Sequence, residues 1–354
     1  CILAGEGSQP GSNKFEGQTK WKELGLKMET DAYELWCFIP LIKASPNLEV
    51  LEFPRIVKDK IPEVTEAIAQ SCPKLRDIDL EKLYYGFEDN YMVDIINTCK
   101  QSGLRRFILS RYGFVLPKWA AAICSYTTTL EIVKIAADGI ESVAITLHLL
   151  RSCTNMRIIE TFTSGLASRD FGRFTAKGLL KEPWVCLGLE TLSIPIIQVH
   201  NIDIAESPDE KYDYQMALYS QISQLTRLSR LNLGFRCKVK IDHDTSLLFS
   251  LKSGLDTLAG LKSMRVLDLH HTTIKLYREE LEWMCDNWPL LERVNYKRWR
   301  FSSEWWMSTR EVLQQSSRAR VVIEDKIRKS AVVSDDEDGD DDDDDDDEED
   351  DDDD

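Results

Sequence analysis

The sequence predicts an α/β fold in which short parallel strands and helices alternate along one continuous array. The first observation is a recurring pattern, L-x-x-L-x-L, whose apolar residues alternate as in a strand with one buried face. It occurs in residues 75–80 and in nine further places, at intervals of 26 to 39 residues. Such a period is typical of a leucine-rich-repeat solenoid, in which no unit buries its apolar face alone. The middle apolar residues of the ten copies are Leu24, Leu51, Ile78, Phe107, Val133, Ile159, Leu192, Leu231, Leu267 and Val294.

The second observation is that apolar residues recur at helical spacing between the copies. In residues 60–71, Ile61, Val64 and Ile68 fall on one helix face, and Pro62 lies near the start, where a missing N–H costs little. The strands are therefore expected to line the concave side, with the helices covering the convex side. Further helices are expected over 29–44, 89–100 and 138–152, after Pro117, after Ser207, and as a closing element over 302–315.

The array has flanking segments of different composition. Residues 1–20 are predicted to be flexible, residues 21–315 to form the repeat domain, and residues 316–333 to be a linker with a final strand near Val321. Residues 334–354 are predicted to be a disordered acidic tail. The repeats lengthen after residue 156, and the extra residues are expected in loops around 163–178, 198–207 and 236–246. The chain starts at Cys1 rather than Met, which predicts a fragment or a processed form.

The acidity of the chain is concentrated in that tail. Of the 61 acidic residues, 19 lie in residues 335–354, which leaves 42 acids against 44 Lys and Arg in the remainder. A near-neutral body with a polyanionic tail argues against nucleic acid as a partner, because the tail repels phosphate. The tail resembles those of leucine-rich acidic nuclear proteins, which implies binding of histones or other basic proteins. The alternative is a solubilising tail without a fixed partner.

The cysteines point to structural thiols in a reducing compartment. No C-x-x-C pair occurs among the nine. The expected compartment is the cytoplasm, the nucleus or both, since nothing resembles a secretory signal. No apolar run reaches the roughly 18 residues that span a bilayer. Six cysteines lie three to six residues before a strand, where a small buried side chain fits, namely Cys72, Cys99, Cys124, Cys153, Cys186 and Cys285.

Few residues suggest catalysis. Of five histidines, His148 lies within an apolar helical pattern and is expected in the core. The adjacent pair His270 and His271 points in two directions, which does not suit joint metal ligation. No phosphate-binding loop, dinucleotide fingerprint or nucleophile elbow is present. The chain is therefore predicted not to be an enzyme and to hold no cofactor or metal.

Four stretches in the second half carry a family resemblance. They are residues 183–192, 219–234, 248–267 and 280–289. Together they resemble the C-terminal repeats of large fungal F-box/leucine-rich-repeat proteins. The resemblance implies a ribonuclease-inhibitor-like horseshoe that selects targets for a cullin-based ubiquitin ligase. These residues contain no F-box, so either one lies upstream of Cys1 and docks the ligase core, or the chain is a repeat-only relative.

The concave strand surface is the predicted site for a protein partner. Ile108, Ile132, Ile158 and Phe162 are expected to form an exposed apolar strip with charges on both sides, unless loops or a missing N-terminal part cover it. The complete set of predicted partner-binding residues is Asp77, Asp79, Arg106, Ile108, Ile132, Lys134, Ile158, Glu160, Phe162, Arg230, Asp268 and Arg293.

Basic and aromatic residues alternate in residues 293–300, near the end of the array. We interpret this stretch as the solvated rim of the last repeat. Two alternatives are a nucleic-acid contact and transient docking of the chain's own acidic tail.

Overall fold

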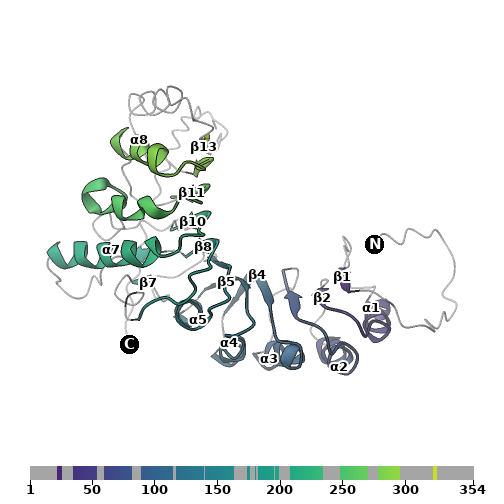
Figure 1. The fold of residues 1–354 in the computed structure, drawn as a ribbon. Helices are drawn as coiled ribbons and strands as arrows, with labels where there is room; N and C mark the ends of the chain where they lie inside the picture. The colour runs from purple at the N-terminus through teal and green to yellow at the C-terminus, as the bar shows by residue number, and fades with distance from the viewer. Residues whose placement is uncertain are drawn as a thin grey trace, which may run out of the picture.

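The computed structural model contains one large parallel sheet with helices on one side. It describes residues 22–25, 35–53, 60–81, 89–114, 117–138, 140–162, 174–175, 180, 182–194, 196–198, 208–233, 248–269, 278–295 and 322–324. The sheet bends, so that the helices lie outside the bend and the uncovered face lies inside it (Figure 1). This helix-free side is called the concave face below.

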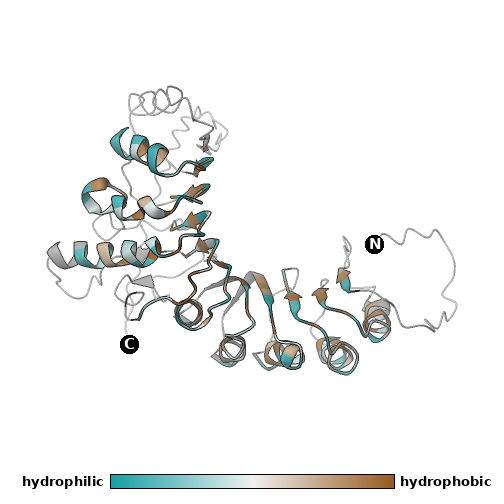
Figure 2. Ribbon diagram, in the orientation of Figure 1, coloured by the Kyte–Doolittle hydropathy of each residue, from teal (hydrophilic) through white to brown (hydrophobic). Residues whose placement is uncertain are grey.

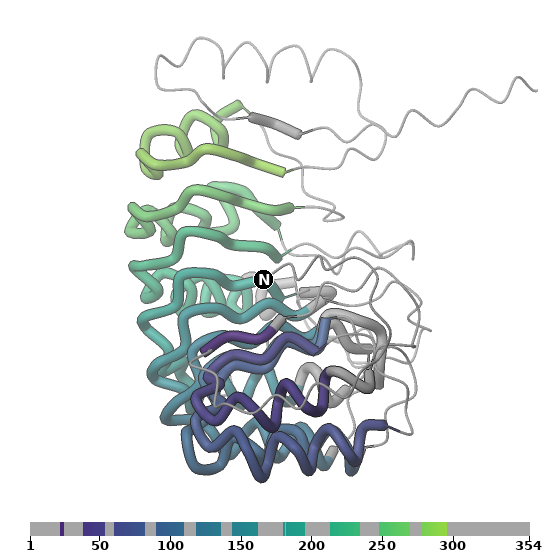
Figure 3. The backbone as a smooth tube through the Cα atoms, turned by 90° about the vertical axis from the view of Figure 1, so that its right-hand side faces the viewer, coloured from purple at the N-terminus to yellow at the C-terminus, as the bar shows by residue number. Residues whose placement is uncertain are grey.

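The large sheet has eleven strands that follow one another in sequence order, apart from the small strands β7 and β9. Every neighbouring pair is parallel, and the strands of one half of the molecule lie one above another in Figure 3. The strands are β1 (Glu23–Gly25), β2 (Val50–Glu52), β3 (Asp77–Asp79), β4 (Arg106–Phe114), β5 (Ile132–Asp138), β6 (Ile158–Phe162), β8 (Thr191–Ser193), β10 (Arg230–Asn232), β11 (Val266–Asp268), β12 (Arg293–Asn295) and β13 (Val322–Glu324).

All ten predicted strands are confirmed, and β13 confirms the strand expected near Val321. The middle apolar residue of each copy lies within its strand and points to the helices. From Leu51 to Val294 these middle residues are at most 1% exposed. They are also in register across neighbouring strands, so one column of apolar side chains runs through the sheet. Burial of each contributes roughly 1.5–3 kcal/mol.

The helices form the second layer and carry both hydrophobic and hydrophilic residues (Figure 2). Most predicted helices are confirmed with shorter bounds. The closing helix expected over 302–315 lies outside the described residues. The helices are α1 (Leu35–Lys43), α2 (Ile61–Ser71), α3 (Asp89–Asn97), α4 (Pro117–Cys124), α5 (Ile140–Ser152), α7 (Pro208–Ser223) and α8 (Arg278–Asn287), with short 3-10 helices η2 (Thr98–Lys100), η4 (Leu251–Ser253) and η5 (Leu255–Gly260).

A series of shared backbone carbonyls joins the strands at the end where each begins. The Lys22 carbonyl accepts the N–H groups of both Glu49 (2.7 Å) and Val50 (2.9 Å). The Glu49 carbonyl in turn accepts those of Arg76 and Asp77, both at 3.0 Å. The same two-to-one arrangement recurs at the carbonyls of Arg76, Arg105, Glu131, Arg157, Glu190, Ser229 and Arg265. We call these nine acceptors the carbonyl series.

Aromatic side chains provide a second link between neighbouring units. The Tyr126 hydroxyl donates to the Ile96 carbonyl at 2.9 Å, and the Trp288 indole N–H donates to the Leu258 carbonyl at 3.0 Å. The Tyr219 hydroxyl donates to the Leu248 carbonyl at 2.5 Å. Each bond spans 29 or 30 residues, about one unit. The bonds of Tyr126 and Trp288 are buried and that of Tyr219 is partly buried, so each supplies a backbone carbonyl with a partner.

The longer units depart from the simple alternation. Phe174–Thr175 (β7) pairs in parallel with Ile196–Gln198 (β9), so the loop expected over 163–178 contains a short strand. Between β10 and β11 the described residues form the 3-10 helices η4 and η5. The buried Gln215 side chain holds η4, since its amide donates to the Leu248 and Ser253 carbonyls and its oxygen accepts the Leu248 N–H.

The cysteine prediction is largely confirmed. Cys72, Cys99, Cys153 and Cys186 are buried free thiols, whereas Cys124 and Cys285 are partly exposed. Burial raises the pKa of the Cys99, Cys153 and Cys186 thiols to about 12, which keeps them neutral.

The prediction for His148 was wrong. This side chain is exposed on α5, because it falls on the face of the helix that points away from the sheet.

Gly103 offers a test of the turn between η2 and β4. Its φ of 78° is left-handed, and an added Cβ would lie 2.8 Å from Cγ2 of Thr129. We expect Gly103→Ala to lower the free energy of unfolding by about 1–3 kcal/mol, measured by urea denaturation. Gly260→Ala is the matched control, because its Cβ would meet nothing within 4 Å and its φ is not positive. Equal effects of the two substitutions would contradict this account of Gly103.

Candidate functional site: the concave face of the sheet

The concave face consists of two rows of side chains that run across the strands. Because successive strand residues point to opposite faces, the residues on either side of each buried middle residue lie together on the concave side. The first row is Val50, Asp77, Arg106, Ile132, Ile158, Thr191, Arg230, Val266 and Arg293. The second row is Glu52, Asp79, Ile108, Lys134, Glu160, Ser193, Asn232, Asp268 and Asn295.

Ion pairs connect neighbouring strands from β3 to β6. Arg105, just before β4, binds the Asp77 carboxylate with both Nε (2.9 Å to Oδ1) and Nη2. Arg106 binds Asp79 at 3.0 Å. Lys134 binds Glu160 at 2.9 Å in the second row. Each acid is thereby held under a longer basic side chain from an adjacent strand.

This arrangement corrects part of the sequence prediction. Ile108 was expected to be exposed but is buried, with 6% exposure. Four predicted acids are also buried, because short side chains on strands a few ångströms apart are covered by their longer neighbours. These acids are Asp77, Asp79, Glu160 and Asp268.

The accessible part of the apolar strip is smaller than predicted. Ile132 and Ile158 are direct register partners in the first row, and both are half-buried. Arg106 and Lys134, also half-buried, lie on the neighbouring positions of β4 and β5. The side chain of Phe162 lies outside the described residues. The structure thus brings together an apolar pair with basic residues beside it.

The C-terminal part of the face has a different character. Arg230 and Arg293 are exposed and stand on either side of the half-buried Val266. In the second row, Asn232 donates to the Ser193 hydroxyl at 2.9 Å. The Oδ1 atom of Asn295 is buried and accepts no hydrogen bond within the described part of the chain. Polar side chains rather than apolar ones therefore dominate here.

A row of alternating charges along the edge of this face was not predicted. From Lys22 to Arg265, the residue that follows the first anchor of each copy also provides the carbonyl of the carbonyl series. Five ion pairs join such residues of neighbouring units: Lys22–Glu49 (3.0 Å), Glu49–Arg76 (2.5 Å), Glu131–Arg157, Arg157–Glu190 and Arg265–Glu292. The signal is readable in the sequence, where nine of the ten residues at this position are charged and the sign changes at most steps, apart from the successive Arg76 and Arg105 and the uncharged Ser229. The row is Lys22, Glu49, Arg76, Arg105, Glu131, Arg157, Glu190, Ser229, Arg265 and Glu292, and we call it the charge ladder.

Glu190 is the most connected member of the charge ladder. It accepts from Arg157 at 3.0 Å and from Arg227 at 3.1 Å. The Arg157 hydrogen bond, followed by the charges of Arg157 and Arg227, lowers the pKa of Glu190. The hydrogen bond from Lys22 similarly lowers the pKa of Glu49. Bonding to Glu190 raises the pKa of Arg157, and bonding to Asp77 raises that of Arg105.

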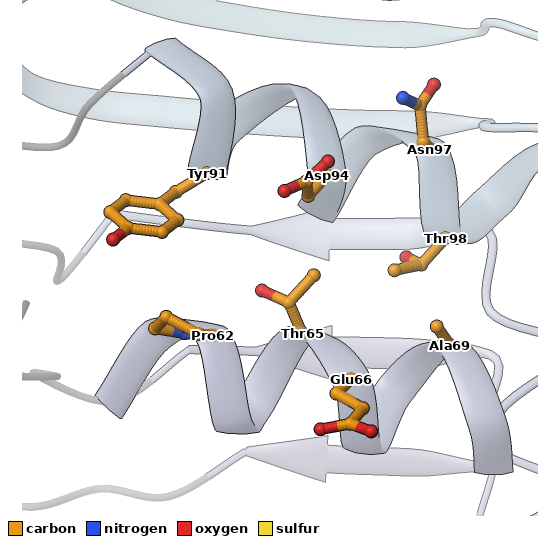
Figure 4. A pocket seen from close by; sticks show the side chains of 8 residues that line it. All are labelled: Pro62, Thr65, Glu66, Ala69, Tyr91, Asp94, Asn97 and Thr98. Carbon is orange, nitrogen blue, oxygen red and sulfur yellow. The ribbon is translucent and has the colours of Figure 1, made fainter. Parts of the chain in front are cut away.

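A groove of about 380 Å³ lies on the opposite, convex side, between α2 and α3. Thr65 of α2 and Thr98 of η2 extend into it, whereas Glu66 and Asn97 point away (Figure 4). The Thr65 hydroxyl is buried without a hydrogen-bond partner among the described residues. The described residues that line the groove are Pro62, Thr65, Glu66, Ala69, Tyr91, Asp94, Asn97 and Thr98.

A metal site and a membrane-spanning helix are two further features that the described residues could form. These residues contain no cluster of three or more His, Cys, Asp or Glu side chains able to hold a metal ion. Within the same residues, no helix combines the length and the apolar character needed to cross a bilayer.

The charge ladder gives a pH-dependent prediction. We expect Glu190→Gln to lower the Tm by a few degrees at neutral pH and low salt, because Arg157 and Arg227 lose their shared partner. A lowered pKa stabilises the fold above the unfolded value of 4.5, and this stabilisation is lost as the pH falls through the folded pKa. The difference from the wild type should therefore shrink on acidification, as measured by thermal unfolding.

Glu182→Gln is the matched control, because Glu182 is exposed in the same unit and pairs with no described residue. If the Tm difference between the wild type and Glu190→Gln stayed the same at low pH, the proposed stabilisation by the charge ladder would be contradicted.

Comparison with protein-family models finds no matching family, and comparison with curated proteins finds no significant match. The residues and geometry of the concave face therefore carry the functional argument.

Proposed function

We propose that this chain is a leucine-rich-repeat solenoid that recognises a protein partner on its concave face. The observation that supports this is the order of the sheet, in which eleven parallel strands follow the sequence and all the labelled helices lie on the other face (Figure 1). Regular intervals between the strands and a continuous apolar column are what a stacked array of units requires. In the proposal these units form a ribonuclease-inhibitor-like horseshoe.

The composition of the face suits a protein more than a small molecule. Ile132 and Ile158 offer a partly desolvated apolar pair, and Arg106 and Lys134 beside them offer charge-assisted hydrogen bonds. Protein interfaces commonly combine such an apolar centre with a polar rim. The ion pairs with Asp79 and Glu160 hold both basic side chains in place before binding, which lowers the entropy cost of association.

We further propose that the partner is a substrate of a cullin-based ubiquitin ligase and that the chain is the substrate-binding region of an F-box-type adaptor. The four stretches that resemble fungal F-box/leucine-rich-repeat proteins support this finer assignment. Docking to the ligase core requires an F-box upstream of Cys1. Co-purification of ligase-core subunits with the full-length gene product tests this part separately from the concave face.

The concave face can be tested by introducing charge into its apolar pair. We expect Ile132→Glu/Ile158→Glu to weaken partner binding about tenfold or more, because buried carboxylates are costly at an interface centre. The measurement is quantitative affinity purification with the full chain, followed by titration of each captured protein.

Leu187→Glu/Leu290→Glu is the control, since both leucines are exposed and lie outside the two rows. Circular dichroism and thermal unfolding of both variants verify the fold. Equal binding by the concave and control variants would refute the concave site.

A second candidate function is binding of basic proteins through the acidic tail. It is favoured by the 19 acidic residues of 335–354, which have no base among them. Such a polyanion attracts histones and similar proteins through many exposed, salt-sensitive pairs. The concave face and the acidic tail use different residues for recognition. Substitutions can therefore abolish either binding function without affecting the other.

Neutralising the tail tests this second function. We expect replacement of the eight Asp residues of 340–347 by Asn to weaken histone binding several-fold and to flatten its salt dependence, measured by fluorescence anisotropy. The Ile132→Glu/Ile158→Glu variant should bind histones as the wild type does. If the affinity for histones were unchanged by the tail substitutions, the tail would be excluded as the binding element.

A further inference from the structure

The concave face is electrically uneven along its length. Around β1 to β3, the acids Glu23, Glu52 and Glu81 are at least partly exposed and form no ion pair with any described residue. Among the described residues, the basic side chains beside these strands are Lys22 and Arg76, which bind Glu49, and Arg105 and Arg106, which bind Asp77 and Asp79. The N-terminal end of the face therefore presents net negative charge.

The opposite end presents arginines. Arg230 and Arg293 are exposed in the first row, and Val266 occupies the strand between them. Two strand spacings place their backbones about 10 Å apart. Arg230 makes no ion pair with the described residues and carries its charge into solvent. The second row here contains two acids, the buried Asp268, and Glu324 of β13, which is in register with Asn295. Between β10 and β12, an acidic segment finds the exposed guanidinium groups of Arg230 and Arg293.

We propose that the acidic segment 335–354 of the same chain docks on the concave face over Arg230 and Arg293. The segment contains 19 acidic residues, and no other part of the chain approaches this density. The attraction is many weak, exposed pairs rather than one precise contact, because any carboxylate in the run can face either arginine. Guanidinium groups bind carboxylates in a bidentate manner, which favours arginine positions over lysine ones.

The segment is covalently connected to the sheet and is therefore held close to its proposed docking surface. β13 ends at Glu324 and pairs with β12, so the chain leaves the sheet beside the two arginines. The ten residues from 325 to 334 can span up to about 33 Å, whereas three strand spacings from β13 to β10 cover about 14 Å. A tether of this length gives an effective concentration in the millimolar range, enough to populate contacts that are weak between separate molecules.

The proposal does not depend on the identity of a protein partner. It predicts that a partner bound to the C-terminal half of the concave face competes with segment 335–354. A partner bound at Ile132 and Ile158 can bind without displacing the segment. The proposal also predicts release at high salt, because exposed pairs are screened over about 8 Å at physiological ionic strength and about 3 Å at 1 M.

The test places a reactive amine at the docking surface of the full chain. In Arg230→Lys the charge is kept, and a water-soluble carbodiimide can join the new amine to a carboxylate in contact with it. We expect peptide mapping by mass spectrometry to find this cross-link to segment 335–354 at low salt and to lose most of it at 1 M salt. The native Lys252, exposed on η4 in the helix layer, is the control amine and should not be cross-linked to the segment.

Three outcomes would overturn the proposal. They are absence of the cross-link at position 230, equal cross-linking of Lys252, and a cross-link that joins two chains in a mixture of 14N- and 15N-labelled protein. A further variant, Arg230→Lys/Arg293→Gln, keeps the probe and removes its neighbour. We expect about a threefold lower yield from it, as for loss of one exposed pair. Circular dichroism checks that both variants are folded.

Discussion

The carbonyl series is the constraint on which the rest of the structure depends. Each of its nine carbonyls accepts two consecutive N–H groups from the following unit, from Lys22 to Arg265. Two donors on one acceptor fix both the distance and the orientation at which the next strand starts. Because the constraint is in the backbone, it tolerates any side chain at that position, and Ser229 occupies it where charged residues occupy the rest. The alternating side chains of the charge ladder reinforce the same spacing from outside.

With the strand entrances fixed, the remainder of each unit is free to vary. Intervals between strands range from 26 to 39 residues, yet the middle apolar residues of neighbouring strands stay in register. The register shift between β4 and β5 lies farther along these two strands, between Leu109 and Gly113. Side-chain hydrogen bonds accommodate this variation in length. Gln215 satisfies backbone groups of Leu248 and Ser253 at η4, and Thr161 replaces an apolar anchor by donating to the Ser193 carbonyl at 3.1 Å. Variation in length is therefore accommodated outside the sheet, and the concave face stays continuous.

The strands were predictable from sequence because their signal is local. Three apolar residues at fixed spacing identify each one, and even the interrupted copy at 156–161 forms a strand. The helices were predictable for the same reason, and α1 (Leu35–Lys43) lies within the pattern over 29–44.

The accessibility of the concave residues was not predictable in this way. Whether Asp77 is buried depends on Arg105, a residue 28 positions away whose side chain crosses to the preceding strand. Ile108 follows the concave alternation correctly and is still buried, because its exposure depends on the residues around it rather than on the direction of its side chain. His148 was wrongly expected in the core, because an apolar helical pattern does not by itself show which side of the helix faces the sheet. The charge ladder, by contrast, could have been found by comparing the residue that follows the first apolar residue in each copy of the strand pattern.

Within the described part of the chain, side-chain bonds between units join immediate neighbours, as Tyr126, Tyr219 and Trp288 illustrate by reaching back or forward a single unit. Cooperativity in such a molecule is transmitted stepwise rather than through a common centre. Loss of order should begin at the outermost strands and move inward, so that amide hydrogens of β5 and β6 outlast those of β1 in exchange with solvent. A lesion in one unit then divides the chain into two segments that unfold independently.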